Sequence, residues 1–174
     1  MKKRVRHFIE DIPLLGKLFR CLYRKVLLQK HPLAKFPGSQ DYWERRYAAG
    51  GDSGSGSYGK LAEFKARVLN QFVAQAGIRT VIEFGCGDGA QLALARYPEY
   101  LGLDVSETAV ALCQERFADD SARRFCLMSD YAGEQAELAL SLDVLFHLVE
   151  PEVYQAYMRT LFAALASLAL LHAA

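Results

Sequence analysis

The sequence predicts an α/β fold in which a parallel sheet has helices on both faces. Three observations lead to this prediction. Strand-like and helix-like segments alternate through the second half of the chain. The strand-like segments are continuous apolar runs, which is the pattern of strands that are buried on both faces. A glycine-rich turn follows the first strand, at the place where α/β folds bring a ligand close to the backbone.

The first 37 residues differ in character from the rest and are expected to form a basic helical arm and a linker. Residues 1–35 contain ten basic and two acidic residues, a net charge of +8, which leaves −7 for the remainder because the whole chain carries +1. Apolar residues recur at helical spacing here, interrupted by Pro13 and Gly16. The arm is too short and too charged to cross a bilayer. We expect it either to dock on a membrane surface or protein partner, or to pack on its own domain.

Residues 38–174 form the second predicted domain, and their composition narrows its class. The chain is 52% hydrophobic and 174 residues long, enough for one globular core. An acidic body does not favour nucleic-acid binding, which needs a positive surface. The cysteines form no C-x-x-C pair, so we expect reduced thiols, no metal site and a cytoplasmic location. They are Cys21, Cys86, Cys113 and Cys126.

Residues 41–60 begin as a helix with several aromatic residues and continue as a loop rich in glycine and serine. The loop is either a flexible linker or a lid that folds over a site. Tyr58 and the neighbouring aromatic residues favour a lid, because such side chains are costly to leave in solvent. Helical spacing then continues over residues 61–76, and Gly77 stands where a helix ends.

The remaining elements follow in alternation. We expect strands at residues 81–84, 100–104, 124–128 and 138–146, and helices at residues 89–96, 106–118 and 151–165. Ser106 is the expected N-cap of the second of these helices. The alanine- and leucine-rich end of the chain either extends the last helix or supplies a fifth strand at residues 168–171.

The turn after the first strand reads Glu83-Phe84-Gly85-Cys86-Gly87-Asp88-Gly89. Its glycines allow a sharp turn and close approach of a ligand to the backbone. A nicotinamide dehydrogenase would need G-x-G-x-x-G to hold a pyrophosphate, whereas the spacing here is G-x-G-x-G. The carboxylate of Glu83 would repel a pyrophosphate and suits a cationic ligand.

This pattern resembles motif I of the class I S-adenosylmethionine-dependent methyltransferases, whose cofactor is a sulfonium that also carries an ammonium group. The resemblance extends from about Tyr42 to Phe162. It implies that Glu83 positions the methionine part of S-adenosyl-L-methionine, and that the turn formed by Gly85, Cys86 and Gly87 lies against it. It also implies that Tyr58 covers the cofactor.

Two further acids match positions in this family. Asp104 ends the second strand nineteen residues after Gly85, close to the ~20-residue offset of a ribose-binding acid. The resemblance implies that Asp130 accepts from the adenine amino group, with Tyr131 or Val105 as the apolar wall. The alternatives are a helix cap for Asp104 and a simple turn for Asp130.

The fourth strand and its exit occupy the family position that faces the transferred methyl group. Ser141 is expected to contact the cofactor there, and Asp143 and His147 to position the substrate. The pKa of a free imidazole lies near neutrality, so His147 is either a general base or a structural residue. There is no Asn-Pro-Pro-Tyr, the motif of many amino-methyltransferases.

The resemblance also implies elements that the sequence does not contain. Only 89 residues follow Gly85, whereas the complete seven-stranded fold continues through further strands. We therefore expect a C-terminally short member that lacks the last strands, with an uncovered sheet edge that favours self-association. The predicted function is methyl transfer to a small-molecule acceptor. The alternative is a catalytically impaired cofactor-binding protein that docks through its basic arm.

Overall fold

The computed structural model describes residues 36–172, with side chains through residue 166. From Gly38 onward these residues belong to one compact unit. The predicted basic arm and nearly all of its linker lie outside the described residues. Within the described part, no helix has the length and apolar character that a membrane crossing requires.

A five-stranded parallel sheet forms the centre of the unit. Its strands are β1 (Thr80–Phe84), β2 (Glu99–Asp104), β3 (Arg123–Leu127), β4 (Ala136–Leu142) and β5 (Leu165–His172). Their order across the sheet is β3-β2-β1-β4-β5, and every neighbouring pair is parallel. The predicted parallel sheet is thus confirmed, and its strand order is that of a Rossmann-like fold. The chain reverses its direction across the sheet between β1 and β4, which is where such folds bind ligands.

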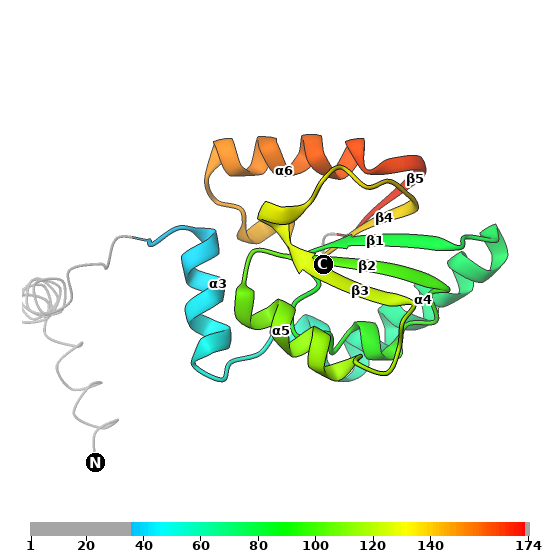
Figure 1. Cartoon of the computed structure of the whole chain (residues 1–174), viewed down its shortest axis with the longest axis horizontal. Helices are drawn as coiled ribbons and strands as arrows, with labels where there is room; N and C mark the ends of the chain where they lie inside the picture. Colours follow the sequence, from blue (N-terminus) through cyan, green and yellow to red (C-terminus); the bar gives the residue numbers. More distant parts are fainter. Residues whose placement is uncertain (1–35, 173–174) are drawn as a thin grey trace, which may run out of the picture. The chain divides into compact units, whose positions relative to one another are not determined.

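Helices cover the two faces of this sheet. They are α3 (Ser39–Ala48), α4 (Gly59–Ala76), α5 (Glu107–Arg116) and α6 (Pro151–Ala163). Figure 1 shows α6 over one face and α4 and α5 over the other. The helix α3 packs against α5. Ser106 caps α5 by accepting from Ala109 N at 3.1 Å, and Gly77 ends α4 in a left-handed conformation, both as predicted.

The core consists of two apolar layers, because successive side chains on a buried strand point to opposite faces. On β1, Val81 packs into the layer that contains Leu69 and Val73 of α4. Ile82 and Phe84 pack into the layer beneath α6. Glu83 therefore points to the same face as Val81, toward α4 and α5, and it does so at the carboxyl end of the strand.

Two predicted elements differ from the structure, and one open alternative is resolved by it. The strand expected at residues 138–146 ends at Leu142, because Asp143 adopts a left-handed φ of 58° that no strand continues through. The helix expected at residues 89–96 is reduced to the short 3-10 turn η2 (Leu92–Leu94), since Ala95 is already extended three residues before Pro98. Of the two alternatives for the end of the chain, the strand forms, as β5 beside β4.

Candidate functional site

The carboxyl ends of β1, β2 and β4 bring together acids that lie far apart in the sequence. Glu83 is the penultimate residue of β1, Asp104 ends β2, and Asp143 follows β4 directly. Glu83 and Asp104 are buried, and the Asp143 side chain is only 12% exposed. A concentration of carboxylates at the switch point of a parallel sheet indicates a site for a cationic or hydroxyl-bearing ligand.

The glycine turn is held tightly between these acids. The amides of Gly85 and Cys86 both donate to the carbonyl of Leu103 on β2, at 2.7 and 3.0 Å. Gly85 and Gly87 have φ values of 86° and 58°, which favour glycine. A Cβ on Gly87 would lie 2.3 Å from Ser53 Oγ. Side chains are thus excluded both by the backbone conformation and by the segment that covers the turn.

Asp104 lies directly beside the turn. One carboxylate oxygen accepts from Gly87 N at 2.9 Å, and the other accepts from Ser106 N at 3.0 Å. Each oxygen of an ionised carboxylate can accept a second hydrogen bond, so two acceptor positions remain for a ligand with neighbouring hydroxyls. Burial raises the pKa of Asp104 above its usual range, while hydrogen bonds from backbone amides, first that of Ser106, oppose that shift.

Glu83 is completely enclosed below the turn. Its carboxylate accepts from Tyr100 Oη at 2.7 Å. Burial raises the pKa of Glu83 to about 7, although the Tyr100 hydroxyl and the charge of Lys65 both act to lower it. Near neutral pH the side chain is therefore poised between its two protonation states, and a cation placed nearby would ionise it.

Cys86 forms an apolar wall of the turn. Its thiol is buried beside Cys113, and the contact with Cys113 together with burial raises the pKa of Cys86 well above its usual range. Cys113 Sγ in turn donates to the carbonyl of Gly87 at 3.1 Å. The Cys86 thiol stays protonated, so it packs rather than reacts.

A covering segment, residues 52–58, lies over the glycine turn and is fastened to Asp88. Ser53 N donates to Asp88 Oδ2 at 3.1 Å, and Asp88 N donates to Ser53 Oγ at 3.0 Å. The Tyr58 hydroxyl donates to the same carboxylate, and Tyr47 Oη lies 3.0 Å from Ser53 Oγ. Tyr58, the predicted lid residue, therefore belongs to a segment that contacts the turn.

The helix α3 is fixed across the site by Glu44. This carboxylate accepts from Ser106 Oγ at 2.6 Å, and from Thr108 N and Oγ1 at 3.2 and 2.6 Å. The hydrogen bond from Ser106 is the main reason why the pKa of Glu44 is lowered. Glu44 thus adds a second cap to α5 and holds α3 next to Asp104.

An ion pair joins α4 to the end of β4. Lys65 Nζ donates to Asp143 Oδ2, and the two side chains are 6% and 12% exposed. The second oxygen, Asp143 Oδ1, is buried and has no hydrogen-bond partner. A Cβ on Gly56 would lie 2.3 Å from Oδ2, so the covering segment passes directly over the pair. Asp143 was predicted to position a substrate, and the structure places it in a charged pair.

His147 lies in η4 (Leu145–His147) and packs among aromatic rings. The Trp43 ring is 4.9 Å away and nearly perpendicular, and the Phe146 ring is 4.3 Å away. Burial lowers the pKa of His147, so the imidazole is neutral at pH 7. Its backbone carbonyl accepts from Ser39 Oγ at 3.1 Å, which ties the start of α3 to this turn.

Two other predicted positions lie beyond β3. Asp130 is exposed in the turn η3 (Met128–Asp130), where its carboxylate accepts from Ser129 Oγ at 3.3 Å. The Tyr131 ring packs edge-on against Phe84 at 5.6 Å. Val105, also predicted, is half-buried directly after Asp104. Val105 thus lies at the end of β2, Tyr131 packs in the apolar layer beneath α6, and Asp130 is an exposed acid.

Ser141 is not brought to the acidic side of the sheet. It points toward α6, where its hydroxyl lies 2.6 Å from Tyr157 Oη, and that hydroxyl donates to the carbonyl of Phe84 at 3.0 Å. The two hydroxyls thus bind the end of β1 to α6. No group of His, Cys, Asp or Glu in the described part of the chain could hold a metal ion.

Lys65, Ser53 and Glu44 were not predicted as site residues. Lys65 carried a sequence signal, because it occurs between Ala62 and Leu69 at the helical spacing of the buried face of α4. A lysine on such a face needs a buried partner. Ser53 and Glu44 carried no comparable signal. Ser53 contacts a residue 35 positions away in the sequence, and Glu44 contacts residues more than 60 positions away.

Comparison with known families agrees with this geometry. The family model described as a methyltransferase domain matches residues 81–167, which include β1, the glycine turn and all three acids. Comparison with curated proteins by sequence finds no relative.

Among solved structures, the N-methyltransferase NodS from Bradyrhizobium japonicum, in complex with S-adenosylhomocysteine, matches with a TM-score of 0.61 and 18% identity, over 74% of this chain and 68% of NodS. CalS10 from Micromonospora echinaspora, an amino pentose methyltransferase with bound S-adenosylmethionine, matches with a TM-score of 0.55 and 22% identity. The match covers 66% of this chain and 52% of CalS10. Magnesium protoporphyrin IX methyltransferase from Synechocystis matches with a TM-score of 0.53 and 21% identity, over 75% of this chain and 64% of that protein. The chain thus spans between about half and two thirds of these proteins.

Proposed function

This chain belongs to the methyltransferase domain family, and on that premise we propose that it transfers a methyl group from S-adenosyl-L-methionine to a small-molecule acceptor. The observation that carries the proposal is the contact between Asp104 and the glycine turn. Its carboxylate is buried, hydrogen-bonded to Gly87 N at 2.9 Å, and retains acceptor capacity for the two hydroxyls of a ribose.

The residues present fit this cofactor on chemical grounds. S-adenosylmethionine carries a sulfonium and an ammonium, and the site offers buried carboxylates at Glu83, Asp104 and Asp143. Gly85 and Gly87 carry no side chain, which lets the backbone turn sharply at positive φ beside the Asp104 carboxylate. A pyrophosphate would meet the same carboxylates with like charge, which argues against a dinucleotide.

When bound, the cofactor supplies an electrophilic methyl group. The chain's own contribution is alignment and exclusion of water rather than strong acid–base chemistry. The covering segment and α3 close over the turn through Asp88 and Glu44. His147, neutral and beside Trp43, is the residue we assign to orienting the acceptor or taking its proton.

The small-molecule class of the acceptor is supported by the acidic body of the chain. The chain outside residues 1–35 carries a net charge of −7, and a negative surface is unsuited to binding nucleic acid. CalS10 and NodS, whose names denote amino pentose and N-methyl transfer, are consistent with a soluble amine or hydroxyl acceptor, but they share only 22% and 18% identity with this chain.

The proposal is tested by measuring release of S-adenosylhomocysteine from S-adenosylmethionine, by mass spectrometry, with a panel of small amines and alcohols. Product should form with at least one acceptor, and Asp104→Ala should reduce its formation because the ribose loses its acid. An Asp119→Ala variant is the matched control, since Asp119 is an exposed acid after α5. Equal product from the Asp104→Ala variant and the wild-type protein would refute the assignment of the site.

A further inference from the structure

The ion pair between Lys65 and Asp143 is an unusual feature for the inside of a small domain. Two charges are removed from water at a place where a leucine and an alanine would pack at lower cost. The pair is also incomplete. Asp143 Oδ1 is buried and lacks a partner, and Lys65 Nζ has three N–H groups but donates to one acceptor among the described residues.

The backbone around the pair is arranged to keep it in place. Asp143 has a left-handed φ of 58°, the one non-glycine residue with positive φ in the described part of the chain. Such a conformation is unfavourable and persists where surrounding contacts impose it. Gly56 passes so close to Asp143 that any side chain there would collide with the carboxylate. Strain of this kind is typical of ligand sites.

The position of the pair relates it to the glycine turn. Val144, the next residue, contacts Gly85: a Cβ on Gly85 would lie 2.4 Å from Val144 Cγ2. Lys65 and Asp143 also lie near enough to Glu83 to influence its ionisation. The unused donor and acceptor therefore lie beside the turn, at the end of β1 and under the covering segment.

We propose that Lys65 and Asp143 together recognise the zwitterionic amino-acid end of the cofactor. Lys65 Nζ donates to the ligand carboxylate while it keeps its bond to Asp143 Oδ2. Asp143 Oδ1 accepts from the ligand ammonium. The inference rests on the proposed function, and it assigns to Asp143 a role in binding the cofactor in place of the predicted role in positioning the acceptor.

Charge complementarity supports this assignment over a purely structural one. A structural ion pair would be expected to satisfy both carboxylate oxygens, because a buried acceptor without a hydrogen-bond partner is unfavourable. A pair with one free acceptor and free donors is instead the complement of a group that carries both an ammonium and a carboxylate. The α-amino acid end of S-adenosylmethionine is such a group.

The test compares two ligands that differ in this group alone. S-adenosylhomocysteine carries the amino-acid end, whereas 5′-methylthioadenosine has the same adenosine and sulfur without it. Calorimetric titration of the full chain should show that Asp143→Asn and Lys65→Met each weaken S-adenosylhomocysteine about 10-fold or more, the loss expected for a charge-assisted hydrogen bond. The affinity for 5′-methylthioadenosine should change by less than about twofold.

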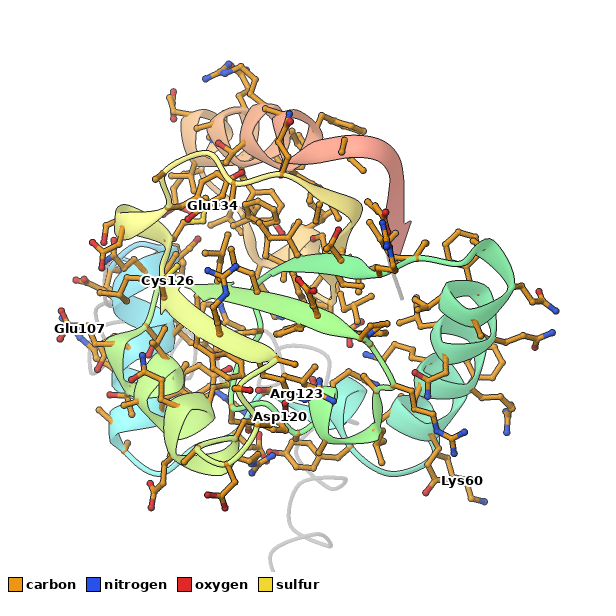
Figure 2. All side chains as sticks on the ribbon, turned by 45° about the vertical axis from the view of Figure 1, so that its right-hand side comes forward. Lys60, Glu107, Asp120, Arg123, Cys126 and Glu134 are labelled. Atoms are coloured by element: carbon orange, nitrogen blue, oxygen red, sulfur yellow. The ribbon has the colours of Figure 1, made fainter. Side chains whose placement is uncertain are left out.

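Two further variants keep the test decisive. Lys65→Met leaves a buried carboxylate unpaired and can prevent folding, so the double variant Lys65→Met/Asp143→Leu removes both charges together. It should fold, lose affinity for S-adenosylhomocysteine and keep its affinity for 5′-methylthioadenosine. Lys60→Met is the matched control, because Lys60 is exposed at the start of the same helix and points away from the sheet (Figure 2).

The outcomes separate this inference from the proposed function. Equal losses for both ligands, or no loss for either, would overturn the assignment of Lys65 and Asp143 while the methyltransferase function stands. Absence of binding by the wild-type protein to both ligands would overturn the proposed function, and the inference with it.

Discussion

Replacing Glu83 with glutamine is expected to stabilise the ligand-free protein at about pH 8 and to change its stability little at about pH 4. The side chain is fully enclosed, and its pKa is raised from 4.5 to about 7, chiefly by burial. Ionised Glu83 is thus unfavourable in the native state. Glutamine has the shape of the protonated acid and keeps an oxygen that can accept from Tyr100.

The magnitude follows from the linkage between proton binding and folding. Between pH 4.5 and about 7 the native state holds a proton on Glu83 that the unfolded chain has lost. Stability therefore falls as pH rises through this window and levels off above it. A shift of this size corresponds to about 3 kcal/mol, taken at 1.36 kcal/mol for each pKa unit. The variant should lack this loss.

The assay is urea denaturation of the wild-type protein and the variant across that pH range. Comparing the two proteins cancels the contributions of other titrating groups. Glu63→Gln provides the control, since Glu63 is an exposed glutamate on α4. A difference in unfolding free energy that stays constant with pH, or a variant that is the less stable protein at about pH 8, would refute the reasoning.

Three other substitutions probe separate parts of the site. Gly87→Ala should cost about 1–3 kcal/mol in denaturation experiments, because φ is 58° and the new Cβ would meet the covering segment; unchanged stability would contradict this geometry. Glu44→Ala should cost about 1 kcal/mol and increase hydrogen exchange in α3, since it removes a cap of α5; unaltered exchange would contradict the docking of α3. Tyr157→Phe should cost about 1–2 kcal/mol without altering the affinity for S-adenosylhomocysteine, because the hydroxyl joins α6 to Ser141 and to the Phe84 carbonyl, away from the acids; weaker binding would place Ser141 in the site.

The parts of the molecule that the sequence predicted well are those specified by neighbouring residues. β1, the glycine turn and β2 follow from apolar runs and glycine spacing within 25 residues, and Ser106 caps α5 through a bond only three residues long. Asp104 could be placed next to the turn because the carboxyl ends of neighbouring parallel strands meet at one edge.

The parts that could not be predicted depend on contacts between distant segments. Lys65 and Asp143 are 78 positions apart, and their pairing requires α4 to pack on the face that β4 shares. The left-handed conformation of Asp143 ends β4 at Leu142, where a local apolar pattern predicted a longer strand. Ser141 illustrates the alternation of side chains along a strand. It lies close to the acids in the sequence, but its side chain points to the opposite face of the sheet, toward α6.

The central claim is that the glycine turn and its acids form an S-adenosylmethionine site. Its most direct test is calorimetric titration of the wild-type protein and of the Asp104→Ala variant with S-adenosylhomocysteine, and with NADH in parallel. We expect saturable binding of S-adenosylhomocysteine, a loss of affinity of about 10-fold or more when Asp104 no longer accepts hydrogen bonds from the two ribose hydroxyls, and no binding of NADH. Tight binding of NADH, or binding of S-adenosylhomocysteine that does not depend on Asp104, would contradict it.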